Sequence, residues 1–242
     1  MKAFLLAAGA GTRLRPLTDH VPKCLVPVCG KPLLAHWLDL LLTQGVDEVL
    51  VNTHHLAGQV HEFVASHPRA RQVSVLHEER LLGTGGTLLR HRDRIGAEPL
   101  LVAHADNLAD FDVAALARGH ASRPAGVEIT MLTFETDHPP SCGIVELDAD
   151  SIVVGFHEKV PDPPGRRANG AVYVLDPSVL VFLASLGKDT IDLSTDVLPH
   201  FLGRIRAEPL VGYLRDIGRP ESLARAQEEF PRYLQHRSRL RR

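Results

Sequence analysis

The chain has 242 residues, of which 44% are hydrophobic and 23% charged, and this ordinary globular composition excludes long disordered tracts and collagen-like repeats. Its formal net charge of −2 excludes a generally basic nucleic-acid-binding protein, and no apolar run approaches the roughly 20 residues that cross a bilayer. The charge is uneven, because residues 1–35 carry a net +4, residues 36–236 carry −10 and residues 237–242 carry +4. A basic start on an acidic body predicts a local anion-binding site, with no nucleic acid and no membrane as partners.

The cysteine count indicates a reducing compartment. Three cysteines without CxxC spacing argue against a disulfide framework and against a structural zinc site. The apolar stretch at 3–7 is shorter than the roughly 7–15 residues of a signal-peptide core. We therefore expect a cytoplasmic protein. The 14 histidines are scattered and form no HExxH motif, so no metal site is expected from them.

The first half of the chain alternates short apolar runs with helical patterns. Buried strands are predicted at 3–7, 49–51, 73–76 and 100–103. Helices are predicted at 33–42, around 60–64, at 84–94 and at 112–121. Pro32 suits the first turn of the helix at 33–42, and Gly45 suits its C-terminal cap. Such alternation is typical of a parallel sheet covered by helices on both faces.

The second half differs, because its strands follow one another with little helix between them. They are predicted at 127–134, 143–147, 152–156 and 171–175, before helices at 177–186, 194–203 and 220–236. The expected fold class is α/β, with a Rossmann-like, mixed, mainly parallel central sheet and a small antiparallel subregion. Residues 1–236 are expected to form a single domain, and residues 237–242 a basic, flexible tail.

A glycine loop follows the first predicted strand. In Gly9-x-Gly11 the backbone N–H groups can approach a phosphate closely because glycine lacks a Cβ atom. Arg13 then offers a planar, bidentate donor for phosphate oxygens. Leu14 stands where the dinucleotide-binding fingerprint needs its third glycine, which disfavours a nicotinamide dehydrogenase. A purely structural turn is the alternative for this loop.

Two further positions carry candidate chemistry. Lys23 follows Arg13 closely in the basic segment and could reach phosphates bound by the glycine loop. Asp106 lies where the fourth predicted strand ends, at the edge where parallel sheets bind ligands. Its carboxylate suits Mg²⁺, a cation that prefers oxygen ligands. A cap on the following turn is the alternative for Asp106.

Residues 6–18 (LAAGAGTRLRPLT) and 22–34 (PKCLVPVCGKPLL) together resemble the sugar-phosphate nucleotidylyltransferases. These enzymes make an NDP-sugar and pyrophosphate from an NTP and a sugar 1-phosphate. Later motifs agree with the family in order and spacing, at 82–87, 105–107, 158–159, 169–173 and 216–221. The resemblance covers residues 1 to about 225, with departures from the usual family residue at Ala105 and Arg219.

The resemblance implies a role for each matching position. Arg13 and Lys23 would be the catalytic residues. The nucleotide would bind to Ala8, Gly9, Gly11, Thr12, Arg13, Gly83 and Thr84. The sugar phosphate would bind to Asn107, Gly143, Glu158, Lys159 and Asn169, with the antiparallel subregion as the sugar-binding part. Asp106 and Asp216 would hold Mg²⁺, with Mn²⁺ as an alternative. No β-helix domain is expected, and a homodimer is left open.

The choice of base and sugar depends on fewer residues. Glu78 and Glu79 precede the 82–87 motif and could accept hydrogen bonds from the N1–H and the amine of guanine, although solvated glutamates are an alternative. The motifs also resemble mannose- and heptose-1-phosphate guanylyltransferases, which favours GTP with a hexose or heptose 1-phosphate over UTP or dTTP. Two rival functions are a non-catalytic nucleotide-sugar sensor and a cytidylyltransferase for an alcohol phosphate. Both predicted metal ligands disfavour the sensor, and Glu158-Lys159 and Asn169 favour a sugar substrate.

Overall fold

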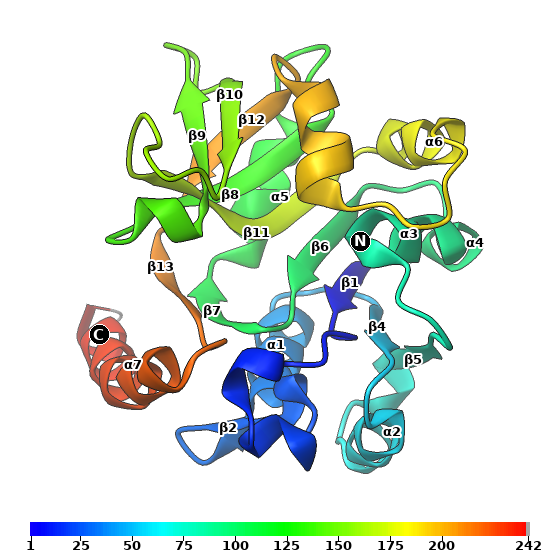
Figure 1. Ribbon diagram of the computed structural model, residues 1–242, viewed down its shortest axis with the longest axis vertical. Helices are drawn as coiled ribbons and strands as arrows, with labels where there is room; N and C mark the ends of the chain where they lie inside the picture. Colours follow the sequence, from blue (N-terminus) through cyan, green and yellow to red (C-terminus); the bar gives the residue numbers. More distant parts are fainter. Residues whose placement is uncertain (241–242) are drawn as a thin grey trace. The chain divides into compact units, whose positions relative to one another are not determined.

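The computed structural model of the protein describes residues 1–240, and Figure 1 labels its helices and strands. The chain divides into two compact units, each made of three separate segments. Unit 1 comprises Met1–Phe4, Arg80–Ala103 and Val113–Leu210, and unit 2 comprises Leu5–Glu79, His104–Asp112 and the chain from Val211 onward. The first strand, β1 (Ala3–Leu6), has residues in both units.

The sheet of unit 1 is built around β11 (Arg167–Leu175). This strand runs antiparallel to β6 (Leu100–His104) and to β8 (Ile129–Glu135), and β8 runs parallel to β12 (Ile205–Pro209). A second antiparallel pair, β9 (Gly143–Leu147) and β10 (Val153–Glu158), joins β11 where Ile144 pairs with Ala168. The antiparallel subregion predicted for the second half is therefore present.

Short helices pack on the strands of unit 1. α5 (Val113–Ala121) packs on β8 and β11, and α3 (Gly83–Arg90) packs on α6 (Pro177–Ser185). α4 (Arg92–Ile95) follows α3 directly. At the start of α6, the Asp176 carboxylate accepts a hydrogen bond from the Ser178 N–H, which satisfies one of the free donors of the first turn.

Unit 2 contains a parallel pair of strands, β4 (Val49–Thr53) and β5 (Val73–His77). All five residues of β4 are buried, as expected for a parallel strand covered on both faces. α1 (Leu33–Thr43) packs on β4, and α2 (Ala57–Ser66) packs on β5. The predicted strands and helices of this region are thus confirmed.

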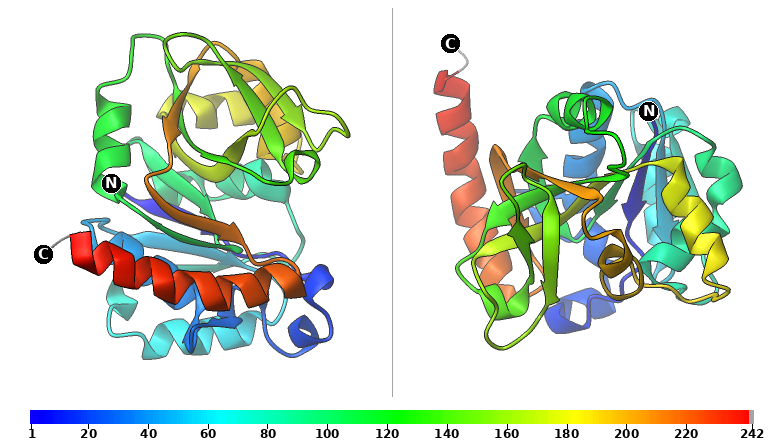
Figure 2. Two further views of the ribbon diagram at one scale, coloured as in Figure 1. Left: turned by 90° about the vertical axis from the view of Figure 1, so that its left-hand side faces the viewer. Right: turned by 90° about the horizontal axis from the view of Figure 1, so that it is seen from above.

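A small antiparallel sheet in unit 2 was not predicted from the sequence. Its strands are β7 (Asn107–Phe111) and β13 (Gly212–Asp216), and α1 packs on β7. The long helix α7 (Pro220–Leu240), continuous in Figure 2, packs on β13. Two-residue strands β2 (Pro27–Val28) and β3 (Lys31–Pro32) form a hairpin before α1.

The mixed α/β architecture is confirmed, and three local expectations differ from the structure. The helix predicted at 84–94 is interrupted at His91 between α3 and α4. The helix predicted at 194–203 is instead a π-helix (Leu193–Val197) followed by a 3-10 helix (Leu198–Phe201). Pro199 has no N–H for the regular α-helical ladder, and the Asp192 carboxylate takes the N–H groups of Ser194 and Thr195. The strand predicted at 171–175 extends back to Arg167.

A fourth difference concerns the end of the chain. The predicted tail begins at residue 237, but α7 continues through Arg237 to Leu240. Asp110 on β7 accepts hydrogen bonds from the Tyr233 hydroxyl at 2.7 Å and from the Arg237 guanidinium, so this part of the helix is tied to unit 2. Arg241 and Arg242 lie outside the described residues. The single domain over 1–236 stays a prediction.

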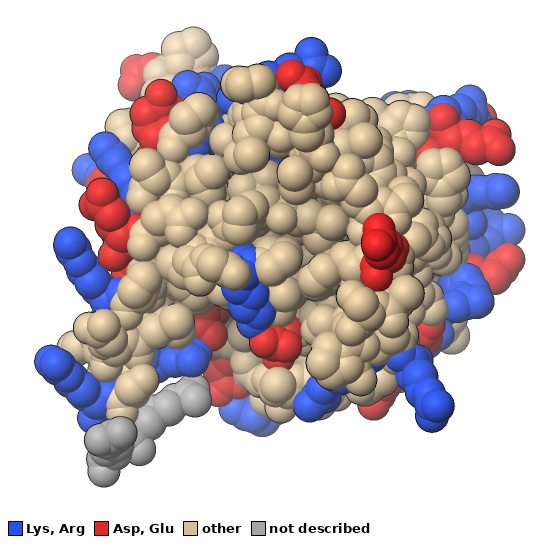
Figure 3. Space-filling model, turned by 90° about the horizontal axis from the view of Figure 1, so that it is seen from below, with Lys and Arg blue, Asp and Glu red and all other residues tan. Residues whose placement is uncertain are grey.

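On the face shown in Figure 3, lysines and arginines are interspersed with aspartates and glutamates. Among the described residues of that face, the lysines and arginines do not gather into a broad basic area. Within residues 1–240, no helix combines the length and the apolar character needed to span a membrane.

Candidate functional site

Strand pairing in unit 2 brings two distant carboxylates together. β7 begins directly after Asp106, and in its register with β13 Asn107 lies opposite Asp216. The Ile217 N–H donates to the Asp106 carbonyl oxygen at 3.4 Å. On the other side, the Trp37 indole N–H donates to the Asn107 carbonyl oxygen at 2.7 Å and ties α1 to the start of β7. The two predicted metal ligands thus lie side by side.

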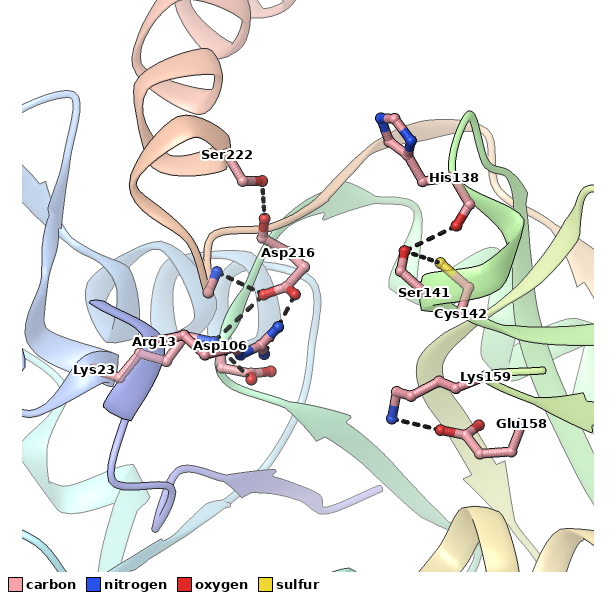
Figure 4. A network of polar contacts seen from close by, with 11 residues as sticks. Arg13, Lys23, Asp106, His138, Ser141, Cys142, Glu158, Lys159, Asp216 and Ser222 are labelled. Atoms are coloured by element: carbon pink, nitrogen blue, oxygen red, sulfur yellow. Dashed lines mark hydrogen bonds and ion pairs between the residues drawn. The ribbon is translucent and has the colours of Figure 1, made fainter. Parts of the chain in front are cut away.

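A lysine ammonium joins these two carboxylates. The Nζ atom of Lys23 lies 2.8 Å from Asp106 Oδ2 and 3.4 Å from Asp216 Oδ1, and the Lys23 side chain is only 6% exposed. Arg13 Nη2 lies 3.7 Å from the other carboxylate oxygen of Asp216. Figure 4 shows both cationic side chains pointing toward the carboxylates. The structure therefore brings Arg13, Lys23, Asp106 and Asp216 into one cluster, which we call the carboxylate cluster.

The side chains of the carboxylate cluster leave no room for a Cβ atom at Gly218, two residues after Asp216. The Gly218 N–H donates to Asp216 Oδ1 at 2.7 Å. A Cβ atom at Gly218 would lie 2.8 Å from Arg13 Nη2 and 2.9 Å from Lys23 Nζ. The Ser222 hydroxyl donates to the Asp216 carbonyl oxygen. Asp216 is therefore held by its own backbone and by the start of α7.

Electrostatics keep Asp106 ionised. Burial by itself would raise the pKa of Asp106, but the Lys23 ammonium, with smaller contributions from His104 and Arg13, outweighs it and lowers the pKa below its ordinary value. His104 is a neighbour that the sequence analysis did not single out. Its Nε2 atom is buried and has no hydrogen-bond partner in the part of the chain that the structure describes.

The glycine loop is shaped by close contacts with the Lys23 segment. Gly11 has a φ of +64°, and a Cβ atom there would lie 2.9 Å from Thr18 Cγ2 and 3.1 Å from Lys23 Cβ. The Thr18 hydroxyl donates to the Gly11 carbonyl oxygen at 2.8 Å. Thr12 and Arg13 follow on an exposed 3-10 turn, so Gly11 has both a conformational and a packing requirement.

The other loop positions fit an open backbone. Gly9 is exposed, and a Cβ atom there would meet nothing within 4 Å. Ala8 is buried, and the N–H of Ala7 donates to Asn52 Oδ1 at 2.7 Å. The Asn52 amide in turn donates to Glu78 Oε2 at 3.3 Å. Asn52 is a second residue that the sequence analysis missed, since nothing in the strand pattern marks it as a support of the loop.

The two candidate glutamates differ in exposure. Glu78 is buried at 5% exposure and is bonded to Asn52, and its carbonyl oxygen contacts His54 Nδ1 at 2.8 Å. Glu79 is exposed. Of the pair, only Glu79 presents its side chain to solvent, and its role in base recognition stays a prediction.

Three of the predicted sugar-phosphate-binding residues of unit 1 lie on β9 and β10 or directly after them. Gly143 pairs with Glu158 across the strands, and a Cβ atom at Gly143 would lie 2.6 Å from Glu158 Oε2. It would also lie 2.7 Å from the Phe156 ring, so only glycine leaves this space open. Lys159 Nζ lies 2.6 Å from Glu158 Oε1, and the Lys159 N–H donates to the Cys142 carbonyl oxygen at 3.1 Å. Figure 4 shows the Glu158–Lys159 pair.

Asn169 is held by a residue that the sequence analysis did not single out. Its Nδ2 atom donates to the Tyr173 hydroxyl at 2.7 Å, and its Oδ1 atom accepts the Ala171 N–H at 2.9 Å. The register between β11 and β8 shifts between Asn169 and Tyr173, and Ala171 has a φ of +53°. Burial raises the pKa of the Tyr173 hydroxyl well above its ordinary value, so it stays protonated. We call Gly143, Glu158, Lys159, Asn169 and Tyr173 the strand cluster.

Three other predicted positions have structural contacts of their own. A Cβ atom at Gly83 would lie 2.4 Å from the Ile191 carbonyl oxygen, and Gly83 has a φ of +73°. The Thr84 hydroxyl accepts the Leu193 N–H at 2.7 Å. The Asn107 backbone carries the contact with Trp37 described above. Nucleotide binding at Gly83 and Thr84 and sugar-phosphate binding at Asn107 stay predictions.

Comparison with known proteins gives the family of the chain. The model of the nucleotidyl transferase family matches residues 2–232, so this chain belongs to that family. It is 30% identical over 235 residues to the mannose-1-phosphate guanylyltransferase of Mycobacterium tuberculosis, a match that covers 95% of this chain and 64% of the relative. It is 31% identical over 226 residues to the mannose-1-phosphate guanyltransferase beta-B of Xenopus laevis, covering 91% and 62%. The chain thus spans just under two thirds of the length of these curated relatives.

Solved structures share the fold. A Bacillus anthracis structure assigned as a glucose-1-phosphate thymidylyltransferase superimposes with a TM-score of 0.86 at 22% identity, covering 94% of each chain. HddC from Yersinia pseudotuberculosis, also solved in complex with GMP-PN, superimposes with a TM-score of 0.78 at 25% identity, covering 95% of this chain and 99% of HddC. The resemblance drawn from the sequence motifs is confirmed.

Proposed function

We propose that this protein is a sugar-1-phosphate nucleotidylyltransferase, which makes an NDP-sugar and pyrophosphate from an NTP and a sugar 1-phosphate. The observation that carries the proposal is the carboxylate cluster, which joins Asp106 and Asp216 to Lys23 and Arg13 in a member of the nucleotidyl transferase family. A phosphoryl-transfer site needs cationic groups because its substrates are polyanions.

The reaction would be a single in-line displacement. A phosphate oxygen of the sugar 1-phosphate attacks the α-phosphorus of the NTP, and the bond between this phosphorus and the α–β bridging oxygen breaks to release pyrophosphate. Arg13 and Lys23 would bind phosphate oxygens and offset the charge of two mutually repelling substrates. The exposed backbone around Gly9 would lie against the triphosphate.

The residues of the cluster also fit a divalent cation. The Lys23 ammonium lies between two carboxylates, and a metal cation could occupy this place instead of the ammonium. No group of three or more histidine, cysteine, aspartate or glutamate side chains within residues 1–240 could hold a metal. Two carboxylates match Mg²⁺ sites that are completed by water and substrate phosphates. Asp106 and Asp216 would hold the ion, and when bound it would neutralise charge on the reacting phosphate.

The strand cluster would bind the sugar phosphate. Glu158 accepts hydrogen bonds, as sugar hydroxyls require, and Lys159 supplies a cation for the phosphate. For the base we propose GTP, with a hexose or heptose 1-phosphate as the second substrate. The names of the two guanylyltransferase relatives support GTP, whereas the assignment of the Bacillus anthracis structure keeps dTTP as a second candidate. Cytoplasm as the compartment also stays a prediction.

The test is a substrate panel. The purified protein is assayed by pyrophosphate release with GTP, UTP, dTTP, CTP and ATP against mannose, glucose and heptose 1-phosphates, with Mg²⁺ or Mn²⁺. We expect release only when both an NTP and a sugar 1-phosphate are present, with GTP the most active base. Binding of nucleotide without pyrophosphate release from any pair would identify a non-catalytic sensor instead. Choline phosphate is added to the panel as a further acceptor, and turnover with CTP and choline phosphate but with no sugar 1-phosphate would identify the alcohol-phosphate alternative.

A further inference from the structure

Lys23 differs from an ordinary surface lysine. Its side chain is 6% exposed, and its Cβ atom packs close to Gly11, where an added Cβ atom would come within 3.1 Å. Its base is therefore held in place, and its Nζ atom lies in reach of one oxygen of Asp106 and one oxygen of Asp216. Lysine is a compact point charge on a flexible stem, so only its tip has to move to change partners.

The charges around Lys23 leave little attraction for a second cation. Two carboxylates face the Lys23 ammonium, and the Arg13 guanidinium lies near the remaining oxygen of Asp216. The Gly218 N–H uses the same Asp216 oxygen that contacts Lys23. A divalent cation at these oxygens would face a like charge at short range in a partly buried site, where repulsion is strong. The ammonium and a metal ion are therefore alternative occupants of the same oxygens.

We propose that Lys23 is an internal counter-ion that suppresses divalent-cation binding until a nucleotide offers its ammonium another partner. The proposal rests on the proposed function, because the partner would be the triphosphate held by the neighbouring glycine loop. The triphosphate attracts the ammonium, which leaves the two carboxylates available to a metal. Because binding linkage is reciprocal, nucleotide and metal would each strengthen the binding of the other through Lys23.

The first test measures metal binding without any nucleotide. Binding of Mn²⁺ to the purified protein is followed by electron paramagnetic resonance of the free ion for the wild type, Lys23→Met and Lys31→Met. Lys31 is the matched control, because it pairs with a single carboxylate, Asp39, in the same unit. We expect Lys23→Met to bind Mn²⁺ at least about tenfold more tightly than the wild type, since it removes one charge at contact distance. We expect Lys31→Met to stay within about twofold of the wild type.

Equal Mn²⁺ affinity of Lys23→Met and the wild type would overturn the proposal. Adding Asp106→Asn to Lys23→Met is expected to abolish the gain, and a gain that survives this change would place the ion elsewhere and would also overturn it. Circular dichroism and thermal melting verify that each variant is folded, and Lys23→Gln is a second variant that removes the charge but keeps a donor.

A measurement on the chain with Lys23 intact covers the case in which neither Lys23 variant folds. The wild type and Asp106→Asn are then compared for Mn²⁺ binding without nucleotide. Equally weak binding supports the proposal, and tight binding by the wild type that Asp106→Asn loses overturns it. These Mn²⁺-binding assays contain no nucleotide and measure no turnover. A failure of the proposed role of Lys23 is therefore distinguishable from a failure of the proposed function, which pyrophosphate release tests separately.

Discussion

The carboxylate cluster of unit 2 and the strand cluster of unit 1 are built by different means. The first joins charged side chains from segments far apart in the sequence, with Lys23 between Asp106 and Asp216. The second is organised by backbone: Gly143 leaves space for Glu158, and a register shift in β11 holds the Asn169 amide against Tyr173. Under the proposed function, the charged side chains of the first would bind phosphates, and the fixed hydrogen-bonding groups of the second would bind sugar hydroxyls.

The largest effect is expected from a substitution in the carboxylate cluster. Asp106→Asn keeps the shape of the side chain but removes the negative charge that pairs with Lys23 and is proposed to hold the metal. We expect kcat to fall at least about 100-fold, because several kcal/mol of charge stabilisation correspond to such a factor. Pyrophosphate release is the measurement, with thermal melting as the control for folding. Turnover within a few-fold of the wild type would contradict the metal assignment.

A smaller loss should follow from crowding the strand cluster. Gly143→Ala places a Cβ atom 2.6 Å from Glu158 Oε2, so the glutamate must shift. We expect KM for the sugar 1-phosphate to rise about tenfold or more, because a shift of about 1 Å can cost up to 100-fold, while KM for the NTP changes little. Gly165→Ala is the control, since a Cβ atom there meets nothing within 4 Å. Equal changes in both KM values would show that the two clusters do not divide the substrates as proposed.

Removing one hydroxyl tests the side-chain support of Asn169 in the same cluster. Tyr173→Phe keeps the buried ring but removes the oxygen that accepts a hydrogen bond from Asn169 Nδ2. We expect an increase of about three- to tenfold in KM for the sugar 1-phosphate, the equivalent of one lost hydrogen bond, with kcat little changed. A variant with wild-type kinetics for several sugar 1-phosphates would limit Tyr173 to a role in packing.

The smallest effect on activity is expected at a charged contact outside both clusters. Asp110 is buried and accepts hydrogen bonds from Tyr233 and Arg237, which tie α7 to β7. Asp110→Asn should lower the free energy of unfolding by about 1–2 kcal/mol, because it weakens a hydrogen bond to a charged group. Urea denaturation measures the loss, and turnover is expected to match the wild type. A stability equal to the wild type would mean that these contacts only follow from the packing of the helix.

Local patterns predicted much of the fold, and they failed where distant contacts decide. The strand predicted at 49–51 is an uninterrupted apolar run in the sequence, and the helix from Leu33 carries its apolar residues at helical spacing. β7 and β13 carry no such pattern, because each is stabilised by the other and by the helices that pack on them. The end of α7 was misplaced for the same reason, since Arg237 reads as part of a charged tail until Asp110 is seen beside it.

The sequence by itself determined the family and the candidate residues, because the glycine loop, Asp106, the Glu158-Lys159 pair and Asp216 are motifs of fixed residue type and order. Only the tertiary structure decided how these residues are arranged. The bridging position of Lys23, the space left by Gly218 and Gly143, and the support of Asn169 by Tyr173 are distances between atoms of separate segments. A linear pattern states which groups are present, whereas Coulomb attraction, steric exclusion and hydrogen-bond direction depend on where the folded backbone places them.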